Sequence, residues 1–174
     1  MTDEQLRIRS YLEAQGAKLA PPATIEKVRA AMADLRAAAD AVPPSRFSER
    51  PGTDEWSANE VLAHVVAAGA HFGDAIVSAL DSRPQPPRTE GRGIEGAPAG
   101  TAAEWCDLLA RDREALFERV LRADPLAQLE TPIEHGMFGP LNWRETLLFM
   151  RLHDLDHAGQ LQKIAAALTA SHSA

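Results

Sequence analysis

The run Trp56-Ser57-Ala58-Asn59-Glu60-Val61-Leu62-Ala63-His64 decides the fold, because it marks the start of a long helix. A serine with a glutamate three residues later has the form of a capping box, in which each side chain bonds the backbone amide of the other residue. The same form recurs at Thr101-Ala102-Ala103-Glu104 and at Asn142-Trp143-Arg144-Glu145. Apolar residues at the helical period follow each box, which predicts helices over 57–80, 101–123 and 142–168.

One further amphipathic segment precedes these helices, at 24–42. Its apolar residues recur at alternating steps of three and four, and it ends before Pro43-Pro44. Residues 1–20 form an N-terminal extension with the pattern of an accessory helix. Aromatic residues make up 5% of the chain and no run alternates polar with apolar residues, so strands are not expected. The sequence thus predicts one all-α domain over 1–174.

The connection between the second and third of these four helices, 81–100, constrains how they are arranged. It is too long for a simple turn between antiparallel neighbours. Fully extended it would reach roughly 65 Å, whereas the helix before it is about 36 Å long. We therefore expect a four-helix bundle with up-down-down-up topology, in which 81–100 is a crossover between two parallel helices. The alternative is an insertion that joins antiparallel helices.

Composition and charge exclude several classes of protein. The 18 Lys and Arg residues against 25 Asp and Glu give a net charge of −7 without a basic run, so nucleic acid is not an expected partner. The single cysteine, Cys106, forms no internal disulfide. No apolar stretch approaches the roughly 20 residues that cross a bilayer, and the first residues are acidic and polar, unlike a signal peptide. We expect a cytoplasmic protein with no membrane partner.

Three of the six histidines fall on inward-facing helical stripes. His153 and His157 are four residues apart, which places both imidazoles on one face of the last helix, and His64 lies on the apolar stripe of 57–80. Three neutral imidazoles facing one core suit a divalent metal and leave a coordination position open, as in catalytic sites. The alternative is that they are core histidines bonded to other side chains or to water.

The same residues carry a resemblance to a known family. The run from Trp56 to His64, followed by His153-x-x-x-His157-x-x-Gln160, is similar to the DinB-like (DinB/YfiT) family of bacterial metal-binding four-helix bundles, over roughly 24–168. The resemblance implies that His64, His153 and His157 bind a divalent ion, zinc or nickel. It also implies an enzyme that activates a low-molecular-weight thiol, or water, for transfer to a small electrophile. The alternative is a non-catalytic metal- or ligand-binding bundle, and a homodimer is a further expectation.

Two more residues are candidates for a catalytic role. Gln160, one turn after His157, could bond metal-bound solvent or a ligand carbonyl, or it could be a core amide bonded across helices. His135 lies in the segment 134–140, just before the last helix. It could overhang the site and shuttle protons, or it could be a solvated loop histidine.

The remaining polar residues near these positions have ordinary interpretations. His71 fits a helix boundary and His172 lies in the C-terminal tail. Asp154 and Asp156 are expected to be solvated, because each points about 100° away from its neighbouring histidine on the helix. Asp112 falls on the predicted inner stripe of 101–123, where it could support a metal histidine or pair with an arginine such as Arg36.

Overall fold

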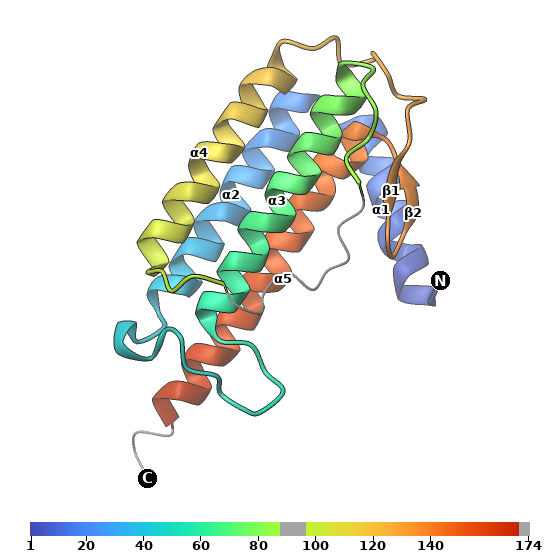
Figure 1. Cartoon of the computed structure of the whole chain (residues 1–174). Coiled ribbons are helices and arrows are strands. Elements are labelled where there is room, and N and C mark those ends of the chain that lie inside the picture. The colour runs from blue at the N-terminus through green and yellow to red at the C-terminus, as the bar shows by residue number, and fades with distance from the viewer. Residues whose placement is uncertain (88–96, 171–174) are drawn as a thin grey trace.

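The computed structural model describes residues 1–87 and 97–170 of the chain. Within that part the elements are five α-helices, one short 3-10 helix and a two-stranded hairpin (Figure 1). Their bounds are α1 Asp3–Lys18, α2 Pro21–Asp40, η1 Pro44–Arg46, α3 Ala58–Leu80, α4 Ala102–Leu121, β1 Ile133–His135, β2 Gly139–Leu141 and α5 Trp143–Ala170. The all-α class is therefore confirmed. Part of the expected crossover, 88–96, and His172 lie outside the described residues.

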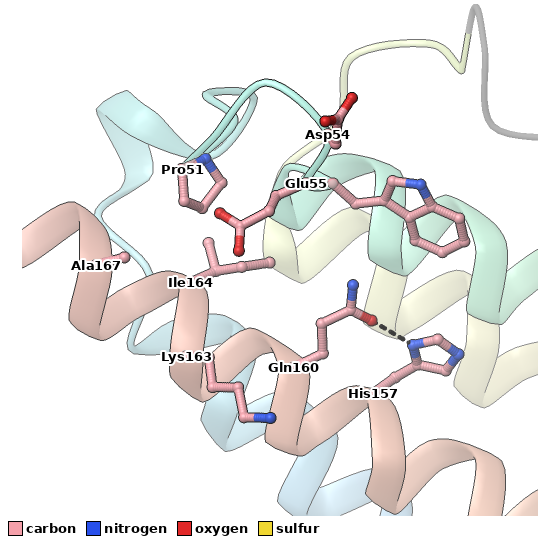
Figure 2. A pocket seen from close by; sticks show the side chains of 9 residues that line it. Pro51, Asp54, Glu55, His157, Gln160, Lys163, Ile164 and Ala167 are labelled. Atoms are coloured by element: carbon pink, nitrogen blue, oxygen red, sulfur yellow. Dashed lines mark hydrogen bonds between the residues drawn. The ribbon is translucent and has the colours of Figure 1, made fainter.

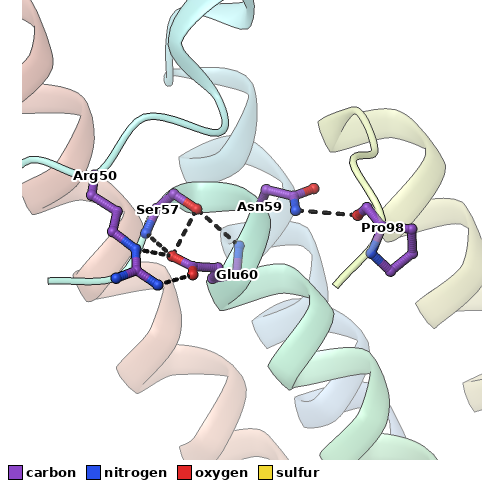
Figure 3. A network of polar contacts seen from close by, with 5 residues as sticks. All are labelled: Arg50, Ser57, Asn59, Glu60 and Pro98. Carbon is purple, nitrogen blue, oxygen red and sulfur yellow. Dashed lines mark hydrogen bonds and ion pairs between the residues drawn. The ribbon is translucent and has the colours of Figure 1, made fainter. Parts of the chain in front are cut away.

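The three expected capping boxes are present, and each fixes the start of its helix. At α3 the Ser57 hydroxyl accepts from the Glu60 amide (3.2 Å), and the Glu60 carboxylate accepts from the Ser57 amide (2.8 Å). Figure 3 shows that Glu60 also pairs with Arg50, whose hydrogen bond lowers the pKa of Glu60 to about 2. Equivalent boxes open α4 and α5. α2 begins at Pro21 rather than at Thr24, because proline is well tolerated in the first turn of a helix.

The helices α2, α3, α4 and α5 lie side by side in Figure 1, and contacts at their ends give their directions. Near the start of α3, the Asn59 amide donates to the carbonyl of Pro98 (3.2 Å; Figure 3). The same side chain accepts from the indole of Trp105, near the start of α4 (2.9 Å). Past the end of α3, Asp81 pairs with Arg119 near the end of α4. α3 and α4 therefore run in the same direction.

The core between these helices has two parts along their length. One joins the ends of α2 and α5 to the starts of α3 and α4, with buried Leu35, Leu62, Leu109 and Leu161. The other joins the starts of α2 and α5 to the ends of α3 and α4, with buried Val28, Ile76, Phe117 and Leu147. α2 and α5 thus run opposite to α3 and α4. α1 packs outside them, where buried Leu12 contacts a third group that includes Leu148 and Phe149 of α5.

The hairpin before α5 is a departure from the sequence analysis, which expects no strands. β1 and β2 pair antiparallel, with Ile133 opposite Leu141 and His135 opposite Gly139. Each strand has three residues, which is too short for polar and apolar residues to show an alternating pattern. Gly139 has a φ of +71°, and Arg9 of α1 donates to the neighbouring carbonyl of Phe138 (2.6 Å). The hairpin is therefore tied to α1.

α3 departs from a second expectation, that no apolar stretch reaches the length of a bilayer. By length and composition this helix of 23 residues is apolar enough to cross a membrane, and in the described ranges it is the one such helix. Many of its apolar residues, Val61, Val65 and Ile76 among them, are instead buried against the other helices. A buried core helix meets the same criterion of length and apolarity, which accounts for the difference.

Candidate metal centre

Three histidines from two helices converge between α3 and α5. Each of His64, His153 and His157 offers one ring nitrogen, and these three atoms lie within 4.8 Å of one another. His64 Nε2 and His153 Nε2 are 3.2 Å apart. Two nitrogens that bind one tetrahedral zinc ion at about 2.0–2.1 Å are separated by about 3.3 Å. The histidine pair that bridges the two helices therefore already has the spacing of two metal ligands.

Local sequence explains why these side chains meet. The one-turn spacing of His153 and His157 places both rings on the same face of α5, with centroids 4.5 Å apart. His64 lies two turns into α3, and its ring is 5.2 Å from that of His153 and 4.9 Å from that of His157. The capping box at Ser57 fixes the start of α3, and the apolar periodicity that follows turns His64 toward the core.

Burial favours the neutral, metal-binding form of two of these imidazoles, those of His64 and His157. Burial, with smaller contributions from His153 and His157, lowers the pKa of His64 to about 4. Burial and the neighbouring His153 also lower the pKa of His157. Protonated imidazole has no lone pair for a metal, so a lowered pKa reduces the competition from protons.

Gln160 fixes the orientation of one of the three clustered histidines, His157. Its side-chain oxygen lies 2.9 Å from Nδ1 of His157, and Figure 2 marks this hydrogen bond with a dashed line. Because an amide oxygen can only accept, Nδ1 of His157 carries the proton and Nε2 keeps its lone pair. Gln160 is therefore bonded to a histidine of its own helix, rather than to a partner across the bundle.

A cavity of about 420 Å³ opens beside His157. Its lining combines residues of α5 with the segment before α3, namely Pro51, Asp54, Glu55, Trp56, His157, Gln160, Lys163, Ile164 and Ala167 (Figure 2). The Trp56 indole is parallel to the His157 ring, with centroids 6.5 Å apart, and is tilted over His64 at 5.2 Å. A small molecule in this cavity would thus contact His157, one of the three clustered histidines, directly.

His135 is buried, so the interpretation of a solvated loop histidine is wrong. Strand pairing turns its ring inward, where it stacks on Phe138 (4.8 Å) and Phe72 (5.7 Å) and meets the edge of Phe149 (4.3 Å). Phe72 and Phe149 also contact the ring of His153, at 6.2 and 5.9 Å. Phe72 and Phe149 form an aromatic wall beside the three clustered histidines, and His135 lies in that wall rather than in the cluster.

Asp154 is fully buried, which overturns the expectation that it is solvated. It faces α4, where Nη2 of Arg113 donates to its Oδ1 (3.1 Å). Asp156 is exposed as expected. The 100° turn that separates Asp154 from His153 points it toward a neighbouring helix instead of toward water. The sequence carried a signal for this pair, because Arg113 is spaced four and three residues from the buried Leu109 and Leu116.

The interpretation of Asp112 is also wrong. Asp112 is exposed and lies beside Arg111 (3.4 Å), while Arg36 pairs with Asp107. The inner stripe of α4 contains Arg113 in its place, one residue further along the chain. One position on a helix is a rotation of about 100°, enough to exchange an inner residue for an outer one.

Comparison with known proteins gives a family. No curated protein and no solved structure matches the chain. The family model described as the DinB superfamily matches residues 26–161, from the first turns of α2 to the part of α5 that contains His153 and His157. This match covers well over half of the chain and spans all three clustered histidines, so the chain belongs to the DinB superfamily.

Proposed function

We propose that the protein is a metal-dependent enzyme in which His64, His153 and His157 hold one divalent ion, zinc or nickel. The observation that carries this proposal is the convergence of three histidine ring nitrogens within 4.8 Å, with two of them 3.2 Å apart. Imidazole nitrogen suits both metals, and three protein ligands leave a position for substrate. A bound ion would supply Lewis-acid chemistry, which lowers the pKa of a thiol or of water.

The proposed reaction transfers a low-molecular-weight thiol, or water, to a small electrophile. In thiol transfer the sulfur forms a bond to the electrophilic atom, the leaving group departs with its electron pair, and the thiol proton passes to solvent. Support comes from the cavity of about 420 Å³ beside His157, which is large enough for a small molecule. The likeness to thiol-dependent members of the DinB-like family favours a thiol over water.

Several residues of the chain would serve this reaction without changing covalently. Gln160 keeps the proton on Nδ1 of His157, and Trp56 covers the rings of His157 and His64 on the cavity side. The wall formed by Phe72 and Phe149 packs against His153 and limits the access of water there. His135 is outside the lining of the cavity, so we give it no role in proton transfer.

The proposal includes further properties that the sequence leads us to expect. We propose an up-down-down-up four-helix bundle formed by α2 to α5, with the residues after α3 as its crossover. We also propose a homodimer in the cytoplasm that binds neither nucleic acid nor a membrane. Analytical ultracentrifugation of the metal-free and metal-loaded protein would measure the oligomeric state.

Elemental analysis tests the metal site directly. Protein purified without a nickel column should contain close to one equivalent of a divalent metal, whereas His153→Ala should contain much less. His71→Ala is the matched control, because His71 belongs to α3 but not to the three clustered histidines. Equally low metal in the wild-type protein and in His153→Ala would refute the site.

Loss of free thiol on incubation with a panel of thiols and electrophiles tests the reaction. Turnover by the wild-type protein, reduced in His153→Ala, would support the enzyme. Stoichiometric metal without turnover across the panel would instead favour a non-catalytic metal-binding bundle.

A further inference from the structure

The carboxylate of Asp154 lies between a metal-site histidine and a buried arginine. Its Oδ1 is 3.1 Å from Nη2 of Arg113 and 3.8 Å from Nδ1 of His153. The side chain of Asp154 is 0% exposed and that of Arg113 is 2% exposed. Within the described residues, Oδ2 of Asp154 and both Nε and Nη1 of Arg113 have no hydrogen-bond partner. Arg113 and Asp154 are therefore both buried, yet they make only one hydrogen bond to each other.

Stability alone does not account for this pair. Desolvating two charges costs several kcal/mol, and a buried ion pair commonly stabilises a protein no better than apolar side chains of similar volume. The strongest arginine–carboxylate pairs make two parallel hydrogen bonds, but this pair makes one. The carboxylate oxygen that Arg113 contacts is also the one that faces His153.

We propose that Asp154 is a positioning residue for His153. Its carboxylate favours the tautomer with the proton on Nδ1, so that the lone pair of Nε2 faces His64. The inference rests on the proposed metal site, where that nitrogen is the ligand atom. Carboxylates commonly play this part behind metal-binding histidines. Arg113 compensates the charge of the buried Asp154 carboxylate.

The geometry on the other side of His153 agrees with this tautomer. Nε2 of His153 is 3.2 Å from Nε2 of His64, so one of these nitrogens donates and the other accepts. With the proton of His153 on Nδ1, Nε2 of His153 is the acceptor. The other α5 ligand is arranged in the same way, because Gln160 accepts from Nδ1 of His157. Each α5 ligand thus has an oxygen facing its Nδ1.

Gly69 of α3 independently supports the placement of the Arg113 side chain, because it leaves room for the guanidinium. A Cβ atom at Gly69 would lie 3.3 Å from both Nε and Nη2 of Arg113, closer than ordinary side-chain contacts. The missing side chain on α3 therefore leaves the space through which the guanidinium of α4 reaches Asp154 on α5. Three helices contribute to the placement of one carboxylate.

Two double variants can distinguish whether Asp154 positions His153 or whether its ion pair with Arg113 only holds α4 against α5. Both variants lose the ion pair. Arg113→Met/Asp154→Leu and Arg113→Met/Asp154→Asn both lack the buried charges, so neither leaves an uncompensated ion. The two variants differ in one property, because the asparagine side chain keeps an acceptor oxygen that can face Nδ1 of His153 and leucine has none. Asp156→Leu is the control, since Asp156 is exposed and immediately precedes His157.

The first readout is the tautomer of His153 in the metal-free protein at mildly alkaline pH. Long-range ¹H–¹⁵N correlation spectra, assigned with His153→Ala, should show the proton on Nδ1 in the wild-type protein, in Asp156→Leu and in the asparagine variant. The leucine variant should shift toward the Nε2 tautomer. This readout needs no metal, so it tests the positioning role even if the proposed metal site is refuted.

The second readout is zinc affinity, measured by competition with a chromophoric chelator. The leucine variant should bind zinc about tenfold to a hundredfold more weakly than the wild-type protein, and the asparagine variant should recover part of that loss. Equal affinity and the same His153 tautomer in the two variants would overturn the positioning role. If the leucine variant does not fold, as judged by circular dichroism, Arg113→Met/Asp154→Ala takes its place with the same expected outcomes. A wild-type protein that binds no zinc, nickel or other divalent ion would refute the proposed function instead.

Discussion

Removing Arg113 alone should destabilise the protein far more than removing Arg113 and Asp154 together. In Arg113→Met the Asp154 carboxylate is left at 0% exposure without its one arginine contact. Stranding one member of a buried pair costs about 3–5 kcal/mol, whereas replacing both members with apolar side chains is close to neutral. For a chain of 174 residues, the single change should lower the melting temperature by about 10 °C.

Urea denaturation of the metal-free protein, followed by circular dichroism, measures these differences. The matched control is the pair of Arg29 and Glu114, which also joins two helices but is exposed by 40% and 48%. Arg29→Met should cost about 0–1 kcal/mol, as exposed ion pairs do. If Arg113→Met costs no more than Arg29→Met, or no more than Arg113→Met/Asp154→Leu, the reasoning about the buried pair is wrong.

Three further predictions concern the capping box of α3, the protonation of His64, and the side-chain oxygen of Gln160 that contacts His157. Ser57→Ala should lower the free energy of unfolding by about 1 kcal/mol through loss of the capping box, and an unchanged urea midpoint would contradict it. The metal-free protein should lose stability as the pH falls from 6.5 toward about 4, because there the unfolded chain protonates His64 and the folded protein does not. His64→Gln should reduce the dependence of the unfolding free energy on pH in this range. The same pH dependence in the variant and in the wild-type protein would contradict the role of His64. Gln160→Ala should weaken zinc binding about tenfold through loss of the contact to His157, whereas exposed Lys163→Ala should not; equal affinities would exclude this role for Gln160.

The sequence was sufficient for the helices and for the three histidines because both depend on local spacing. A capping box involves residues three apart, and the pair His153 and His157 involves residues four apart, so neither needs a distant part of the chain. His64 requires a second helix, but its place on the apolar stripe of α3 already turns it inward. Local periodicity thus determines which face of each helix is buried.

The partners of buried polar residues could not be predicted in the same way. Asp154 and Asp156 are alike in local sequence, each beside a histidine, yet one is fully buried and the other is exposed. The difference arises because α4 faces the side of α5 that carries Asp154, and because Arg113 of α4 lies directly opposite Asp154. Both facts depend on how the helices pack, which the spacing within one helix does not report. Short strands such as β1 are missed for a related reason, since pairing with β2 stabilises them more than their own composition.

The three histidines have different surroundings, and this difference indicates the side from which a small molecule could reach them. His157 borders the cavity, where Gln160 and Trp56 are its neighbours. His153 packs against Phe72 and Phe149, and Asp154 lies behind it within the bundle.

The phenylalanine wall in turn contacts the hairpin, which α1 holds through the bond from Arg9 to the carbonyl of Phe138. The N-terminal extension is therefore connected through the hairpin to the aromatic residues around His153, although it lies outside the region that matches the family model. A substrate that reaches the proposed metal would enter from the cavity beside His157. Changes at its rim, at Glu55 or Lys163, should then alter substrate binding, whereas changes at Asp154 should alter the metal site itself.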